Sequence, residues 1–237
     1  MAQIKKSEIL IDSRLSHIAF IMDGNGRWAK KRGLPRKVGH KFGAEAFEKT
    51  VKNCFSLGIK VVTVYAFSTE NWSRPKDEVN AILSLLDAYI DKTKKYKDIR
   101  IIFLGDKKVF SENIQNKMNE VENSTKDNQN ILNIAINYGG RDEIVHACNE
   151  LINEGKTNIT EKDISEHLYT SASSDPDLII RTANEYRISN FLLWQCAYSE
   201  FYVTKALWPD FNKKELLKAI ENFYSRERKF GGIKEED

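Results

Sequence analysis

The stretch HIAFIMDGNGRWAKKRGLPRKVGH, which spans residues 17–40, decides the fold of this chain. It opens with a continuous apolar run, Ile18–Met22, that predicts a strand buried on both faces. Asp23, two glycines and Arg27 follow directly, and a basic helical segment comes after them. An acid, a flexible backbone and an arginine at the carboxyl end of a buried strand are typical of a parallel sheet that binds a phosphate-bearing ligand at that edge.

Strand and helix patterns alternate along the rest of the chain. Short apolar runs predict further buried strands at Val61–Phe67, Ile99–Leu104, Ile131–Ile136, Leu178–Ile180 and Phe201–Val203. Apolar residues at three-to-four spacing and N-terminal caps at Thr160 and Asn212 predict helices around 44–57, 79–90, 109–126, 141–154, 160–168, 188–196 and 212–226. We therefore expect a single α/β domain with a largely parallel central sheet flanked by helices. It occupies residues 17–232, between an N-terminal extension (1–16) and an acidic tail (233–237).

Composition excludes several classes of protein. The 237 residues are 41% hydrophobic and 30% charged, as in soluble globular proteins and unlike disordered or fibrous ones. The net charge of +3 gives no general electrostatic case for binding nucleic acid. Cys54, Cys148 and Cys196 are far apart and lack metal-binding spacing, so we expect a reducing, cytoplasmic location. We find no signal peptide and no apolar run of about 18 residues, so we expect no membrane span.

Polar residues gather after four of the predicted strands. They are Asp23-Gly24-Asn25-Gly26-Arg27-Trp28, Ser68-Thr69-Glu70-Asn71-Trp72-Ser73-Arg74-Pro75, Asn137-Tyr138-Gly139-Gly140-Arg141, and Arg181 with Arg187 and Ser189. Because ligands of open α/β sheets bind at the carboxyl ends of the strands, we expect these segments to converge on one cleft. Several arginines and a carboxylate would then face each other, which suits a diphosphate and a metal ion.

Each of these signals also has a purely structural explanation. A Gly-x-Gly after a strand is more often a tight turn, and Asp23 alone could cap the following helix. Most arginines are surface residues, and His40 would ordinarily be solvated. Trp28 and Trp72 would ordinarily pack in the core. The co-occurrence of such residues at successive strand ends is what favours a functional site.

Longer motifs resemble the cis-prenyltransferase (isoprenyl transferase) family, most closely its bacterial undecaprenyl diphosphate synthases. The motifs are HIAFIMDGNGRWAKKRG (17–33), GH (39–40), YAFSTENWSRP (65–75), NYGGRDEI (137–144), DLIIRT (177–182) and RISNFLLWQCAYSEFYVTKALWPDF (187–211). They occur in the family's order and spacing, and the resemblance runs from His17 to Gly232. It implies the family's fold, in which the sheet and its helices enclose an apolar tunnel.

The resemblance also implies roles for individual residues. Asp23 matches the family's essential aspartate, which holds Mg²⁺ beside the diphosphates, and Glu200 matches the second carboxylate assigned to the metal. Asn71 matches a position with a proton-acceptor role. The residues that match the allylic diphosphate site are Gly24, Asn25, Gly26, Arg27, Trp28, Arg36 and His40. The other substrate-binding matches are Ser68, Thr69, Glu70, Trp72 and Arg74, and, for isopentenyl diphosphate, Arg181, Arg187, Ile188 and Ser189.

The implied activity is Mg²⁺-dependent condensation of isopentenyl diphosphate with an allylic diphosphate, with farnesyl diphosphate as the expected starter. The implied product is a long-chain polyprenyl diphosphate, undecaprenyl diphosphate for synthesis of the cell-wall lipid carrier. Arg27, Arg36 and Mg²⁺ are suited to stabilise the charge that grows on the departing diphosphate. A neutral carboxamide is a weak base, so our hypothesis is that Asn71 orients or relays the proton while a diphosphate oxygen accepts it.

The hydrocarbon product needs an apolar container. The resemblance implies a tunnel between the sheet and the helices around 44–57 and 79–90. Small Ala66 would leave room near its mouth, and larger residues deeper inside would set the product length. Each methylene-sized group that is buried contributes about 0.8 kcal/mol, so the tunnel also stabilises the growing chain.

One segment departs from the family pattern. The family usually has Arg-Thr-Gly-Gly-Glu where this chain has Arg181-Thr182-Ala183-Asn184-Glu185. If these positions need a positive φ, Asn184 can adopt it at modest cost, but Ala183 cannot do so easily. We expect a slightly shifted turn and weaker binding of isopentenyl diphosphate, with the chemistry intact.

Two other functions stay open. A haloacid-dehalogenase-like phosphohydrolase also uses an aspartate after a strand, but it needs an acid two positions on, where this chain has Asn25. A non-catalytic prenyltransferase-like subunit could dispense with Asp23 and the arginines, which this chain retains. The partners implied by the resemblance are the two diphosphate substrates, a second copy of the chain and no nucleic acid. The homodimer interface would include Trp208–Phe211 and Arg226–Gly232, and product release would involve transient contact with a membrane surface.

Overall fold

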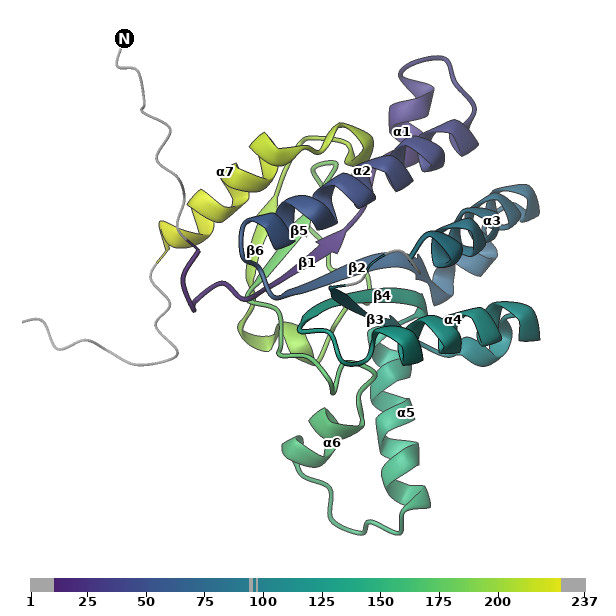
Figure 1. Cartoon of the computed structure of the whole chain (residues 1–237), viewed down its shortest axis with the longest axis vertical. Helices are drawn as coiled ribbons and strands as arrows, with labels where there is room; N and C mark the ends of the chain where they lie inside the picture. The colour runs from purple at the N-terminus through teal and green to yellow at the C-terminus, as the bar shows by residue number, and fades with distance from the viewer. Residues whose placement is uncertain (1–10, 94–95, 97, 227–237) are drawn as a thin grey trace, which may run out of the picture.

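A fully parallel sheet of six strands forms the centre of the molecule, with helices on both of its faces (Figure 1). This computed structural model describes residues 11–93, 96 and 98–226. The strand order across the sheet is β3-β4-β2-β1-β5-β6. The strands are β1 (His17–Ile21), β2 (Val61–Ser68), β3 (Ile99–Leu104), β4 (Asn130–Tyr138), β5 (Leu178–Arg181) and β6 (Glu200–Val203). The predicted parallel architecture is confirmed, and each predicted strand is present. The predicted acidic tail and residues 1–10 of the predicted extension lie outside the described residues.

The helices alternate with the strands along the chain. They are α1 (Asn25–Lys30), α2 (Arg36–Ser56), α3 (Lys76–Thr93), α4 (Glu112–Thr125), α5 (Gly140–Asn153), α6 (Glu161–His167) and α7 (Lys213–Tyr224). Both predicted caps are confirmed: the Thr160 hydroxyl accepts from the backbone of Asp163, and the Asn212 side chain accepts from Lys214 and Glu215. Among the described residues no helix combines the length and the apolar character that crossing a bilayer requires.

The predicted helix over 188–196 is wrong. Ser189, Asn190 and Leu192 have φ angles of 53°, 60° and 45°, and a right-handed helix cannot contain them. Only a short 3₁₀ turn, Gln195–Tyr198, forms at the end of this segment. Phe191 and Leu192, two apolar residues of this segment, are buried in the core although their backbone is an irregular loop.

The two faces of the sheet pack against different layers. In β1, Ile18 and Phe20 belong to the large core cluster shared with α2, α3, α4 and α7, while Ala19 and Ile21 face the opposite layer. Phe20 lies 6.0 Å from the rings of both Trp208 and Phe211. Figure 1 shows α5 and α6 on the other side of the sheet. Because both faces are covered, the four residues Ile18–Ile21 of β1 are all apolar.

Three neighbouring strands, β1, β2 and β4, carry polar side chains that are buried and contact one another across the sheet. The imidazole of His17 in β1 contacts the carbonyl oxygen of Ser174 through Nδ1 at 2.6 Å and the Thr63 hydroxyl in β2 through Nε2 at 2.7 Å. The Asn133 side chain in β4 donates to the same hydroxyl at 3.0 Å. Burial lowers the pKa of His17 to about 4, so its imidazole is neutral at pH 7.

The buried His17 predicts that the fold loses stability on mild acidification. The pKa of His17 is near 6.5 in the unfolded chain and about 4 in the folded chain. The stability that depends on neutral His17 is therefore fully present above pH 6.5 and is lost as the pH falls toward 4. We expect the free energy of unfolding to fall by roughly 2 kcal/mol between pH 7.5 and pH 5.0. Urea unfolding at several pH values measures it. His17→Gln should flatten the curve, and an equal pH dependence in that variant would contradict the assignment.

Candidate active site

A polar cleft of about 640 Å³ lies at the carboxyl ends of the central strands. The cleft lies at the switch point of the sheet, where the strand order reverses. At this point β1 pairs with β2 on one side and with β5 on the other. The predicted site residues on its walls are Asp23, Gly24, Asn25, Gly26, Arg27, Arg36, His40, Ser68, Glu70, Asn71, Arg74, Arg181, Arg187 and Ser189. Three of the four polar strand ends predicted to converge therefore line this cleft, while the fourth, Asn137–Arg141 after β4, contributes no residue to its wall.

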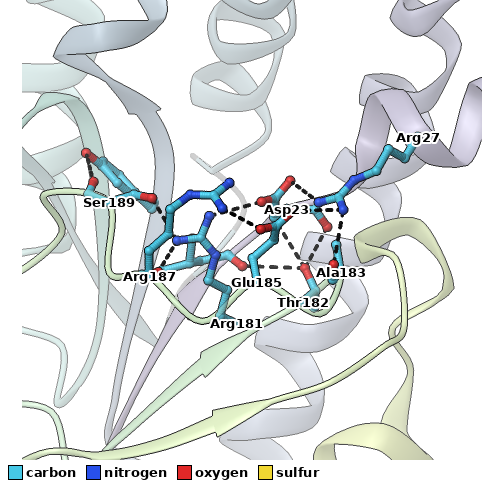
Figure 2. A network of polar contacts seen from close by, with 10 residues as sticks. Asp23, Arg27, Arg181, Thr182, Ala183, Glu185, Arg187 and Ser189 are labelled. Carbon is cyan, nitrogen blue, oxygen red and sulfur yellow. Dashed lines mark hydrogen bonds and ion pairs between the residues drawn. The ribbon is translucent and has the colours of Figure 1, made fainter.

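Asp23 is held between two arginines at the floor of this cleft (Figure 2). Its carboxylate accepts from Arg27 at 3.1 Å through one oxygen and from Arg181 at 3.0 Å through the other. Burial tends to raise the pKa of Asp23, but these hydrogen bonds outweigh it and the pKa lies below its ordinary value. The backbone of Asp23 is fixed by Thr182, whose hydroxyl accepts from its N–H at 2.9 Å and donates to its carbonyl oxygen at 2.6 Å.

Arg181 is the most enclosed cation of the cleft, with 6% of its side chain exposed. Its Nη1 donates to the hydroxyl of Ser189 at 2.7 Å and also to the carbonyl oxygen of Arg187. The carboxylate of Glu185 pairs with Arg27 at 2.9 Å and with Arg187. Figure 2 shows these residues forming one continuous network beside Asp23. Sequence reasoning missed the neutralising role of Glu185.

The turn after β5 has two consecutive left-handed residues. Ala183 has φ of 69° and Asn184 has φ of 59°, so the positions that are usually glycine in the family pattern do take a positive φ here. An alanine in this region costs about 1–2 kcal/mol. The turn is held by hydrogen bonds from Ala183 N–H to Ala206 at 2.7 Å and from Asn184 N–H to Thr204 at 2.8 Å. The effect of Ala183 on ligand binding stays a prediction.

The loop after β1 requires its glycines. Gly24 has φ of 105°, and a Cβ there would lie 2.9 Å from Leu207 and 3.0 Å from Ala183. A Cβ at Gly26 would lie 3.0 Å from the guanidinium carbon of Arg36. The second glycine therefore allows an arginine of α2 to approach the backbone of this loop.

A second carboxylate, Glu78, contacts three basic groups that line the cleft. It lies in the first turn of α3 with 9% of its side chain exposed, and it contacts Arg36 at 3.0 Å, His40 at 3.3 Å and Arg74 at 3.1 Å. Burial tends to raise the pKa of Glu78, but the positive charges of Arg36 and Arg74 lower it below its ordinary value. Burial lowers the pKa of His40. Sequence reasoning missed Glu78, although its position four residues after Arg74 was a usable signal.

The segment after β2 closes the cleft with a 3₁₀ turn, Thr69–Ser73. The side-chain oxygen of Asn71 accepts from the backbone N–H of Ser68 at 3.2 Å, so the carboxamide is oriented by its own turn. Glu70 accepts from the side chain of Asn190 at 2.9 Å, which ties this turn to the loop after β5.

Five predicted site residues do not line the cleft. Trp28 is buried and donates to Asp210 at 2.7 Å, and Trp72 donates to Asn137 at 2.7 Å. Ile188 packs against the core cluster on the second face. Thr69 begins the turn after β2 but is absent from the cleft wall. Glu200 begins β6, opposite the first residue of β5, so it lies at the amino end of the strands, and its carboxylate pairs with Arg226. The structure does not bring Glu200 to Asp23.

In this cleft, the carboxylate of Asp23 could bind Mg²⁺. The part of the chain that the structure describes contains no group of three or more His, Cys, Asp or Glu side chains that could hold a metal. Mg²⁺ does not need one, because it keeps water and substrate phosphate oxygens and takes only one or two carboxylates. Asp23 is a partly exposed carboxylate inside an arginine-lined cleft, which is suitable for that kind of shared site.

An apolar cavity of about 120 Å³ continues from the polar cleft. It lies between α2, α3 and the sheet, and its walls share Met22, Asn25, His40, Ala66 and Ile82 with the cleft. Phe47 and Tyr89, whose ring centroids are 4.7 Å apart, come from later turns of α2 and α3 and line the cavity but not the cleft. A cleft for phosphates that opens into an apolar cavity suits a ligand with a charged head and a hydrocarbon chain.

Comparisons with known proteins point to one family. The family described as "Putative undecaprenyl diphosphate synthase" matches residues 21–231. An isoprenyl transferase of Fusobacterium nucleatum is 54% identical over 92% of this chain and 96% of its own length. Lavandulyl diphosphate synthase from Lavandula x intermedia, solved in complex with dimethylallyl diphosphate, superposes with a TM-score of 0.87 at 33% identity, over 93% of this chain and all of that one. A probable undecaprenyl diphosphate synthase from Campylobacter jejuni gives a TM-score of 0.77 at 36% identity, over 92% and 98% of the two chains.

The contacts of Thr182 predict a measurable loss of stability. Thr182 is buried, and valine has a similar shape but no hydroxyl. In Thr182→Val, the backbone N–H and the carbonyl oxygen of Asp23 therefore each lose a hydrogen bond. We expect Thr182→Val to lower the free energy of unfolding by about 1–3 kcal/mol in guanidinium titrations. Thr157→Val, at an exposed position, is the control and should change it little. Equal effects of the two substitutions would contradict the role of Thr182.

Proposed function

This chain belongs to the undecaprenyl diphosphate synthase family and is a prenyltransferase, and on that premise we propose that it elongates an allylic diphosphate with isopentenyl diphosphate. Farnesyl diphosphate is the proposed starter. The proposed product is a long-chain cis-polyprenyl diphosphate, undecaprenyl diphosphate for the cell-wall lipid carrier. The observation that carries this proposal is the arginine-lined cleft that continues into an apolar cavity between α2 and α3.

The proposed allylic site is the loop Asp23–Arg27 together with Arg36 and His40. The backbone of this loop approaches a diphosphate closely, because Gly24 and Gly26 carry no side chain. Arg27 and Arg36 then face the leaving diphosphate, on which negative charge grows as its carbon–oxygen bond breaks. Mg²⁺, held by Asp23, would supply further positive charge to the phosphate oxygens.

The proposed isopentenyl diphosphate site is formed by Arg181, Arg187 and Ser189. Arg181 and Ser189 already contact each other at 2.7 Å, so a donor pair is in place without ligand. The isopentenyl double bond attacks the allylic carbon, a new carbon–carbon bond forms, and a proton leaves to generate the cis double bond. Asn71, oriented by its contact with Ser68, would direct that proton toward a diphosphate oxygen.

Several finer features belong to the same proposal. We propose a cytoplasmic enzyme that works as a homodimer. We also propose that it contacts a membrane surface transiently when the lipid product leaves. Of the proposed interface segments, Trp208 is buried against the Gly43 carbonyl within its own chain, and residues 227–232 lie outside the described residues.

The direct test is incubation of the purified protein with Mg²⁺, farnesyl diphosphate and labelled isopentenyl diphosphate. We expect labelled polyprenyl diphosphate, and we expect Asp23→Ala or removal of Mg²⁺ by a chelator to lower the rate by at least about a hundredfold. Near wild-type elongation by a folded Asp23→Ala variant would contradict the mechanism. Phosphate release without elongation would indicate a hydrolase, and no reaction would indicate a non-catalytic subunit. Full activity of Asn71→Ala would exclude a catalytic role for Asn71.

The apolar cavity predicts how product length changes. Ala66→Leu adds bulk at the wall shared by the cleft and the cavity, so the products should be shorter by one or more C5 units. Phe47→Ala removes a large ring from the part of the cavity wall that the cleft does not share, so the products should become longer. Chromatography of the labelled products measures both shifts. If both variants give the wild-type length distribution, this cavity does not contain the growing chain.

A further inference from the structure

The hairpin tip that joins α1 to α2 is a dense cluster of positive charge. We define the basic tip as residues 30–41, which contain Lys30, Lys31, Arg32, Arg36, Lys37 and Lys41. No acidic residue occurs from position 24 to position 44, although the whole chain has a net charge of only +3. Figure 1 shows that the hairpin projects from the body of the molecule. The charge is therefore concentrated on one protruding element.

Most of this charge is not used within the fold. Arg32 pairs with Asp210 at 3.2 Å and Arg36 pairs with Glu78 at 3.0 Å. The other four cations, Lys30, Lys31, Lys37 and Lys41, are exposed and make no ion pair within residues 11–93, 96 and 98–226. Four unneutralised lysines on one projection form a surface for an anionic partner.

Apolar side chains are exposed among these lysines. Leu34 at the turn of the hairpin is 39% exposed, and Phe42 in the second turn of α2 is 40% exposed. The backbone N–H of Leu34 donates to the carbonyl oxygen of Ala29 at 2.9 Å, so the turn that presents Leu34 has a defined conformation. Lysines that flank an exposed leucine and an aromatic residue match the head-group and acyl layers of a lipid surface. A purely phosphate-based partner such as a duplex would leave Leu34 without a role.

The basic tip is also continuous with the apolar cavity. The same helix α2 begins in the tip and then lines the cavity with His40, Gly43, Ala44 and Phe47. A hydrocarbon that leaves this cavity near the start of α2 would avoid water if a bilayer lay against the tip. This link rests on the proposed function, since it assumes a polyprenyl product.

We propose that the basic tip, residues 30–41, docks the protein on the surface of an anionic lipid bilayer. The lysines contact the acidic head groups, and Leu34 enters the boundary between head groups and acyl chains. Electrostatic attraction supplies most of the binding, so docking is reversible and weakens as salt is added.

Flotation with lipid vesicles tests this proposal on the full chain. We expect the protein to bind phosphatidylcholine vesicles that contain phosphatidylglycerol, to bind pure phosphatidylcholine vesicles far less, and to dissociate at high salt. Each lysine near an anionic surface is worth about a fivefold change in partitioning, so replacing Lys30, Lys31, Lys37 and Lys41 by glutamine should weaken binding by about a hundredfold or more. Leu34→Ser should weaken it about fivefold.

Matched control variants distinguish an effect of the basic tip from an effect of net charge or of exposed apolar residues elsewhere. The charge control replaces exposed Lys52, Lys60, Lys126 and Lys162 by glutamine, which changes net charge equally, and it should bind as wild type does. Ile159→Ser, at a residue that is 38% exposed, is the control for Leu34→Ser. Equal losses in both lysine sets, no binding by the wild type, or tighter binding to duplex DNA than to vesicles would overturn the proposal. Elongation measured in detergent micelles reports on the proposed function separately, and the tip variants should retain it.

Discussion

Charge balance in the cleft is the constraint on which the rest of the site depends. Five arginines, Arg27, Arg36, Arg74, Arg181 and Arg187, lie on the walls of one cleft, where their like charges repel one another. Three carboxylates pair with them: Asp23 with Arg27 and Arg181, Glu185 with Arg27 and Arg187, and Glu78 with Arg36 and Arg74. Each arginine is therefore held in place before any ligand is present. Under the proposed function, an incoming diphosphate would replace these carboxylate contacts, which favours a ligand that carries several negative charges.

The fold supplies this arrangement through register and local strain. Ile21 pairs with Arg181 in adjacent strands, so the residues that follow β1 and β5 are neighbours at the same edge. Thr182 then joins the two strand ends through the backbone of Asp23. The left-handed conformations of Ala183 and Asn184 are tolerated because backbone hydrogen bonds and the contact of Arg27 with the Ala183 carbonyl hold the turn.

Much of this architecture could be predicted from the sequence, for identifiable reasons. Strands buried on both faces are mostly apolar, so runs such as Ile18–Met22 are distinctive, and the polar residues that follow them mark the ligand edge. The pairing of Glu78 with Arg36 could not be predicted, because it joins helices far apart in the sequence. The position of Glu200 depends on the register of β6. The segment 188–196 was misjudged because its apolar spacing reflects burial of Phe191 and Leu192, and not a helical backbone.

The placement of Glu78 makes α3 a rigid rod with two tasks. Its first turn is tethered to Arg36 and His40 of α2 through one carboxylate, while later residues such as Leu86 and Tyr89 form the wall of the apolar cavity. A helix transmits displacement along its length because its backbone hydrogen bonds keep its turns in fixed relation. The contacts of Glu78 therefore help to fix the position of the helix that forms one wall of the cavity. Under the proposed function, the arginines that contact the diphosphate head are therefore tied to the helix that lines the cavity for the hydrocarbon tail.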